Sequence, residues 1–166
     1  DELDTVVTDK TRLIIVNDPN NPTGAVFPAE TLQHIVDLAH LHNAFIVTDE
    51  VYEHLVFDGA RHVPVATLPG ATERTITISS AGKTFSTTGW KIGWVVAPAD
   101  VITAILTVKQ YLTFVNGAPF QPAIATGLRL GDDFYASIAS NLQRKRTILI
   151  DGLQQAGFQV FSPAGA

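Results

Sequence analysis

The sequence of 166 residues contains no cysteine and no methionine. The absence of cysteine excludes a disulfide framework, a thiolate metal site and a cysteine nucleophile. The absence of methionine includes the first position, which is Asp1. Ordinary removal of a start methionine is not expected to leave an aspartate there. We therefore expect this sequence to be a fragment of a longer chain.

Basic residues and long apolar runs are also scarce. The sequence has 11 Lys and Arg residues and 16 Asp and Glu residues, which give a net charge of -5. This balance predicts no basic surface for nucleic acid or anionic lipid. No apolar run approaches the roughly 18 residues of a membrane helix, and residues 1–4 are acidic where a signal peptide is basic. We expect a cytoplasmic protein with neither nucleic-acid nor membrane partners. With 46% hydrophobic residues, the chain can bury one real core.

Four short apolar runs rich in β-branched residues alternate with stretches of helical period. The runs are residues 13–17, 44–48, 75–79 and 92–97. Nearly continuous apolar strands are typical of a parallel sheet covered on both faces. The alternation predicts an α/β fold with a mostly parallel sheet, in which the fourth strand could be antiparallel because it follows a turn-rich stretch.

Helices are expected between and after these strands. Pro28 suits a first helical turn, and apolar residues recur after it at helical spacing up to Ala39, which predicts a crossover helix. Further helices are predicted at about 98–111, 119–130 and 133–155. Within the last, Arg144 to Arg146 are interpreted as a solvated basic face. Residues 157–163 are predicted to begin a strand of a new unit.

Three polar segments follow directly after predicted strands, where open α/β sheets bind ligands. They are residues 17–24 (NDPNNPTG), 49–53 (DEVYE) and 79–84 (SSAGKT). Taken singly, each has a bland interpretation as a turn, a helix cap or a surface lysine. A P-loop interpretation of Gly82-Lys83-Thr84 fails, because Thr77 stands where that motif needs a glycine and the acidic strand precedes the lysine.

Taken together, the three segments suit one cofactor. Pyridoxal 5′-phosphate (PLP) requires an amine for its Schiff base, a carboxylate for its pyridine nitrogen and hydrogen-bond donors for its phenolic oxygen. A lysine, an aspartate, a tyrosine and an asparagine stand at these strand ends.

In motif order and spacing, the chain resembles the class I and II aminotransferases, PLP-dependent enzymes of fold type I. The resemblance rests on residues 20–24 (NNPTG), 49–53 (DEVYE) and 79–94 (SSAGKTFSTTGWKIGW). It implies ping-pong transfer of an amino group between an amino acid and a 2-oxo acid, in a homodimer. It also implies that residues 1–156 are part of the large PLP-binding domain and that residues 157–166 begin the small C-terminal domain.

The resemblance implies a role for each matching residue. Lys83 is expected to form the Schiff base and to move the substrate proton, and Asp49 to keep the pyridine nitrogen protonated. Asn21 and Tyr52 are expected to donate to the ring oxygen. Ser80 and Lys91 are expected to bind the phosphate, although much of the family has an arginine fork where Lys91 stands. The arginine that binds the substrate carboxylate is expected beyond residue 166.

Residues 66–70 and 73–75, with 80–94, are similar to the branch of kynurenine aminotransferase, glutamine transaminase K and cysteine-conjugate β-lyase. Succinyldiaminopimelate and methionine aminotransferases are bacterial relatives of that branch. The resemblance therefore implies an amino acid with a bulky, sulfur-bearing or aromatic side chain.

Two alternatives stay open. The same residues would serve a PLP-dependent carbon–sulfur β-lyase, and an aminotransferase-like fold can act as a ligand-binding module without turnover. A metal site is not expected, because His34, His40 and His42 share no i, i+4 helix face and His54 and His62 stand apart from them.

Overall fold

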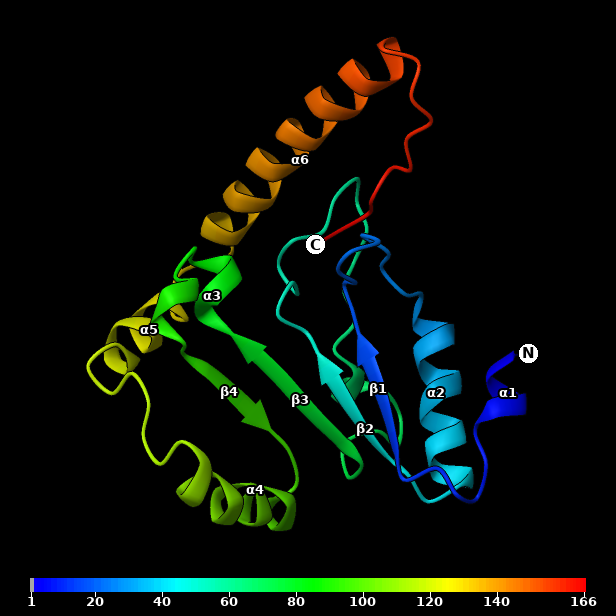
Figure 1. The fold of residues 1–166 in the computed structure, drawn as a ribbon, viewed down its shortest axis with the longest axis vertical. Helices are drawn as coiled ribbons and strands as arrows, with labels where there is room; N and C mark the ends of the chain where they lie inside the picture. The colour runs from blue at the N-terminus through cyan, green and yellow to red at the C-terminus, as the bar shows by residue number, and fades with distance from the viewer. Residues whose placement is uncertain (1) are drawn as a thin grey trace.

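The computed structural model describes residues 2–166. Its centre is a sheet in the order β1 (Leu13–Asn17), β2 (Phe45–Asp49), β3 (Thr75–Ser80) and β4 (Gly93–Val96). The first three strands are parallel and β4 is antiparallel to β3 (Figure 1). The predicted α/β class and mostly parallel sheet are thus confirmed, and the fourth strand, whose direction the sequence left open, is antiparallel. Each strand begins and ends within one residue of the predicted bounds.

The helices surround this sheet on several sides (Figure 1). They are α1 (Glu2–Val6), α2 (Ala29–Leu41), α3 (Ala81–Thr84), α4 (Ala99–Leu112), α5 (Gln121–Gly127) and α6 (Asp132–Gln155), with 3-10 turns at Val65–Thr67 and Thr88–Trp90. The sequence pattern predicted the four longer ones and missed α1 and α3, which are too short to show a helical period. In residues 2–166, none of these helices combines the length and the apolar character needed to cross a membrane.

The main core lies between α2 and one face of the sheet. The helix follows Pro28, whose fixed φ suits a helix start, and its predicted apolar stripe is buried, as Leu32 and Val36 show. The stripe meets the even-numbered residues of β1 and β2, among them Val16 and Ile46. Alternate strand residues point to opposite faces, so the odd-numbered residues of these two strands face the other way.

That other face is only partly covered within residues 2–166. Ile15 is 73% exposed and Leu13 46% exposed, so the expectation of a sheet covered on both faces is wrong for these residues. The apolar runs are continuous because both rows are apolar, but α2 covers only one of them. The odd-numbered row ends in Asn17 and Asp49, which are paired in the strand register.

A second, smaller core supports α3. Ala81, Ile92 and Ile124 are buried together, with Phe85 and Trp90 packed against them. This cluster joins α3 to β4 and α5, so the short helix that carries Lys83 has a fixed backing although Lys83 itself is exposed.

The C-terminal part departs from two expectations. Residues 157–163 form no strand, because no neighbouring strand pairs with them in the described structure and a lone extended segment is unstable as a strand. The chain instead returns to the loop after β1, where Ala164 N donates to Gly24 O at 2.8 Å. Arg146 is not solvated as predicted. It forms an ion pair with Asp58 at 2.7 Å and donates to Pro163 O at 2.7 Å, which anchors α6 to both segments.

Candidate active site

The sheet register brings the three polar segments to one edge. Asn17 is paired with Asp49, and Asp49 with Ile78 two residues before Ser80. Because β1, β2 and β3 are parallel, their carboxyl ends, and the segments that follow them, lie side by side. The arrangement matches the edge at which α/β sheets bind ligands.

The asparagine loop after β1, residues 17–24, is held by its own side chains. Asn17 Oδ1 accepts hydrogen bonds from Asn21 N at 3.0 Å and from Asn20 Nδ2 at 3.1 Å. Asn20 Oδ1 in turn accepts from Thr23 Oγ1 at 2.6 Å. These bonds leave the Asn21 amide free to reach the next segment, where Asn21 Nδ2 donates to the Tyr52 hydroxyl at 3.0 Å.

Asp49 is the last residue of β2 rather than the first after it. Its backbone carbonyl accepts from Asp18 N at 3.2 Å and from Asn17 Nδ2 at 3.3 Å, which binds the two segments together directly behind the carboxylate. One carboxylate oxygen accepts from Val51 N at 3.2 Å. The half-buried side chain thus stands at the end of the open face of the sheet, in a fixed orientation.

Lys83 lies on α3, one turn after β3. Ser80 Oγ caps this turn by accepting from Gly82 N at 3.4 Å, and Thr88 Oγ1 donates to Gly82 O at 3.0 Å. The Lys83 ammonium lies 5.6 Å from the centroid of the Tyr52 ring, within range of a cation–π contact. Lys83, Tyr52 and Asn21 are therefore brought together as predicted, from three segments that are distant in sequence.

A cavity of about 290 Å³ opens beside this lysine. Ser80, Lys83 and Lys91 all contribute to its lining, together with Gly82, Thr88, Ile92 and Gly93. A side chain at Gly82 would meet Ser80 Oγ at 3.5 Å and the Thr88 backbone at 3.3 Å, so a glycine lets the start of α3 pack closely against residue 88. Lys91 has a left-handed φ of 55°, a costly conformation for lysine that functional sites often contain.

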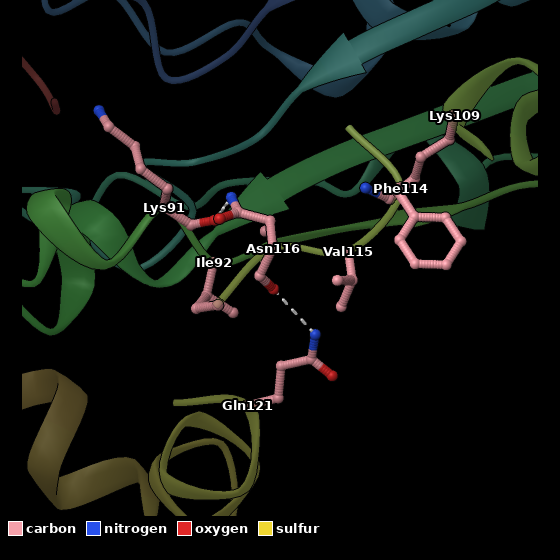
Figure 2. Close-up of a pocket in the computed structure, with 8 residues that line it drawn as sticks. Lys91, Ile92, Lys109, Phe114, Val115, Asn116 and Gln121 are labelled. Carbon is pink, nitrogen blue, oxygen red and sulfur yellow. Dashed lines mark hydrogen bonds between the residues drawn. The ribbon is translucent and has the colours of Figure 1, made fainter. Parts of the chain in front are cut away.

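A second cavity, of about 330 Å³, shares residues 91–93 with the first (Figure 2). Phe114, Val115 and Gln121 line it, and Asn116 Nδ2 donates to Lys91 O at 2.8 Å. Figure 2 shows the Lys91 side chain pointing away from Asn116 and Gln121. The basic residues in its lining are Lys91 and Lys109, and Lys109 Nζ donates to Thr113 Oγ1 at 2.6 Å. Of residues 2–166, those that line it do not include Lys83, Tyr52 or Asn21. The cavity beside Lys83 is therefore the better site.

One group near the site was missed by the sequence analysis. His62 bridges two carboxylates that are each 1% exposed, Asp18 and Glu50, at 3.1 Å from Nδ1 and 3.0 Å from Nε2. Burial of the ring disfavours its charged form, but the hydrogen bonds and negative charges of Asp18 and Glu50 outweigh that effect and raise the pKa of His62 from 6.5 to about 9. No spacing in the sequence places His62 beside Asp18, 44 residues away.

The raised pKa of His62 predicts a pH-dependent stability. The folded protein binds the proton of the His62 ring more tightly than the unfolded chain does. Protonated His62 therefore contributes fully to the free energy of unfolding below about pH 6.5, and this contribution is lost as the pH rises to about 9. The loss amounts to about 3 kcal/mol of unfolding free energy. Urea unfolding of the full natural chain at a series of pH values measures it. The His62→Gln variant should lack this fall, and an equal fall in that variant would assign it to other groups.

Comparison with known proteins supports a single family. The model of the family described as aminotransferase class I and II matches residues 1–166. A probable N-succinyldiaminopimelate aminotransferase, DapC of Mycobacterium tuberculosis, is 50% identical over 165 residues, which are 99% of this chain and 42% of that protein. The kynurenine–oxoglutarate transaminase of Dictyostelium discoideum is 47% identical over 169 residues, covering 99% of this chain and 39% of its own length.

Solved structures agree with the sequence comparison. The structure of N-succinyldiaminopimelate aminotransferase from Mycobacterium tuberculosis superimposes with a TM-score of 0.96 at 50% identity, covering 99% of this chain and 43% of that one. Escherichia coli YbdL, for which a methionine aminotransferase function is identified, gives 0.93 at 35% identity, covering 99% of this chain and 44% of that one. The chain spans less than half the length of these relatives. Its whole length nevertheless carries the fold and the ordered motifs of the class I and II aminotransferases, and it belongs to that family.

Proposed function

We propose that the protein containing this chain is a PLP-dependent aminotransferase. One observation carries the proposal: Lys83, Tyr52 and Asn21 converge at the end of the open sheet face that also carries Asp49. This donor set fits PLP, since it offers an amine, a carboxylate and two donors for an oxygen anion. A cavity of about 290 Å³ beside Lys83 leaves room for the group. When bound, PLP supplies an electron-accepting ring that stabilises the carbanion formed at the substrate Cα.

The residues of this chain would have two kinds of role, binding PLP and transferring a proton. The Asp49 carboxylate suits a protonated ring nitrogen, and the Asn21–Tyr52 pair suits the ring oxygen. Since Asn21 donates to the Tyr52 hydroxyl, the tyrosine proton is free to point elsewhere. Ser80 and Lys91, which line the same cavity, suit a phosphate.

Lys83 is the group suited to covalent attachment and to proton transfer. Its flexible, exposed side chain extends from a short helix backed by a buried cluster, so the amine can move while its backbone stays in place. If PLP were bound and the substrate amino group had replaced the lysine, the free Lys83 amine would be the group to take a proton from the substrate Cα and to give it back. This is the proton relay that transamination needs.

The remaining assignments extend the proposal to the whole protein. Amino acid and 2-oxo acid substrates follow from the relatives, and the activities for which those relatives are named favour an amino donor with a bulky, sulfur-bearing or aromatic side chain. We further propose a cytoplasmic homodimer. We also assign residues 1–156 to the large domain and residues 157–166 to the start of the small domain.

Covalent trapping tests the proposal. The full natural chain is mixed with PLP, its visible absorption is recorded, and borohydride reduction is followed by peptide mapping. We expect one modified peptide, with the pyridoxyl group on Lys83. In a second sample that is not treated with borohydride, amino acids with bulky, sulfur-bearing or aromatic side chains should convert the cofactor to its amine form, and a 2-oxo acid should reverse the change.

Two other results have distinct meanings. Release of pyruvate and ammonia from a substrate with a β-leaving group, without any added 2-oxo acid, would favour the β-lyase alternative. Attachment at another lysine, or no attachment to the full chain, would contradict the proposed site.

A further inference from the structure

The rows of residues that face α2 end in two buried carboxylates. Val16 in β1 is followed on the same face by Asp18, and Ile46 and Thr48 in β2 are followed by Glu50. Asp18 and Glu50 therefore extend the buried face beyond the strand ends, while Asn17 and Asp49 extend the open face. Two buried carboxylates that close together need a compensating partner.

His62 is that partner, and its side chain is 5% exposed. The other carboxylate oxygens are also bonded: Asp18 Oδ1 accepts from Phe27 N at 2.7 Å and Glu50 Oε1 from Val65 N at 3.2 Å. The network thus joins the start of the asparagine loop, the Phe27 backbone three residues beyond its end, Glu50 directly after β2 and the segment 62–65. Ionised carboxylates only accept hydrogen bonds, so both ring nitrogens must donate, and the ring is a cation.

A metal site does not account for this cluster. The two nitrogens of one imidazole point to different carboxylates at hydrogen-bond distance, so they share no common point for an ion. Within residues 2–166 no group of three or more His, Asp or Glu side chains is arranged to hold a metal.

The same two segments carry the proposed cofactor contacts on their opposite face. Asp18 N donates to Asp49 O, and three residues after Asp18 the Asn21 amide donates to the Tyr52 hydroxyl at 3.0 Å. Glu50 lies between Asp49 and Tyr52 in sequence. The two segments are therefore held together by hydrogen bonds to the Asp49 carbonyl and, on the buried side, by the ionic bridge through His62. On the open side, the Asn21 amide and the Tyr52 hydroxyl meet across them.

We propose that His62 is a positioning residue: by bridging Asp18 and Glu50, it holds the two segments so that Asn21 and Tyr52 meet. The inference rests on the proposed function only for its consequence at the cofactor. The raised pKa of His62 agrees with a ring that remains charged through neutral pH. Asp18 and Glu50 are the charged groups that contact it.

The first test uses the PLP-loaded full chain and its visible absorption as a function of pH. Asn21 and Tyr52 favour the anionic ring oxygen, so weakening their contact should raise the pH at which the lysine-bound cofactor loses its proton. In His62→Gln we expect this midpoint to rise by about one pH unit, because losing a hydrogen bond to a charged oxygen changes an equilibrium roughly tenfold.

The controls separate positioning from simple loss of stability. Asn21→Ala should shift the midpoint in the same direction. The exposed His40 on α2, whose Nε2 lies 2.6 Å from Gly70 O, provides the control variant His40→Gln, which should leave the midpoint unchanged. Adding Glu50→Gln to His62→Gln removes one of the two carboxylates that have lost the His62 ring. The midpoint should then return part of the way to the wild-type value. A folded His62→Gln protein with an unchanged midpoint would overturn the proposal. If the wild-type chain binds no PLP at Lys83, the proposed function fails instead.

The second test needs neither cofactor nor variant, and so covers the case in which His62→Gln does not fold. In the cofactor-free chain, nuclear magnetic resonance follows the His62 ring nitrogens and the Asn21 side-chain amide through a pH titration. We expect the Asn21 signal to shift with the same midpoint as the His62 ring, near pH 9. The Gln33 amide on α2, bonded to Asp37 and Pro69, should not follow it. An Asn21 signal that ignores the His62 titration would refute the coupling.

Discussion

Replacement of Lys83 by alanine should abolish covalent binding of PLP and lower transamination by roughly 10²- to 10⁴-fold, the usual contribution of a positioned acid–base group. Alanine removes the amine but leaves the short helix, because the buried members of that helix are Ala81 and Thr84. Non-covalent binding should persist, since Ser80, Lys91, Asn21 and Asp49 remain. The visible spectrum should therefore resemble that of free PLP, although equilibrium dialysis still detects bound cofactor.

Two other lysines make matched controls. Lys145 lies exposed on α6, away from the cavity, so Lys145→Ala should leave attachment and turnover unchanged. Lys91→Ala should keep attachment at Lys83 but weaken PLP binding, because it removes one cation from the phosphate end of the cavity. If borohydride still fixes the cofactor to the Lys83→Ala protein at one site, the attachment residue has been misassigned.

The sequence could predict the sheet because each strand is a short β-branched run bounded by turn residues. Residues 13–17 match β1 at both ends, and β2 and β3 each end one residue later than predicted, at Asp49 and Ser80, because these polar residues still take part in the ladder. The last strand, β4, is one residue shorter than predicted at each end. Three of the predicted site residues, Asn21, Tyr52 and Lys83, also meet, since parallel strands place their carboxyl ends at one edge. Local pattern and topology were sufficient for this part.

What the sequence could not predict depends on contacts between distant segments. Nothing in the spacing relates His62 to Asp18, and a histidine beside a proline-rich turn has no periodicity to indicate burial. Arg146 lies in a basic run that is typical of a solvated helix face, yet its guanidinium meets Asp58, 88 residues away. Residues 157–163 alternate like a strand, but a strand requires a partner and the described structure supplies none.

Replacement of Asp49 by asparagine should separate attachment from turnover. The amide keeps the size of the side chain and can still accept from Val51 N, so the loop and the Lys83 attachment should survive. It cannot balance a protonated ring nitrogen, so the ring loses most of its capacity to accept the electron pair released at Cα. We expect the cofactor to remain bound to Lys83 while the half-reaction with an amino acid slows by roughly 10²-fold or more, the cost of losing about 3 kcal/mol of transition-state stabilisation.

Single-turnover absorbance measures that half-reaction without the second substrate. Asp49→Glu, which restores the charge but moves it by one methylene, should recover part of the rate if charge is the property that matters. Asp37→Asn, on the exposed side of α2, serves as the control for loss of an arbitrary carboxylate. A normal rate in Asp49→Asn would contradict the assignment of Asp49 to the ring nitrogen. Loss of PLP attachment at Lys83 would instead indicate that Asp49 shapes the loop. We expect attachment to be retained and proton abstraction to be slowed because of the place of Asp49 at the end of β2. The Asp49 backbone holds the asparagine loop, whereas the Asp49 carboxylate faces the open side of the sheet.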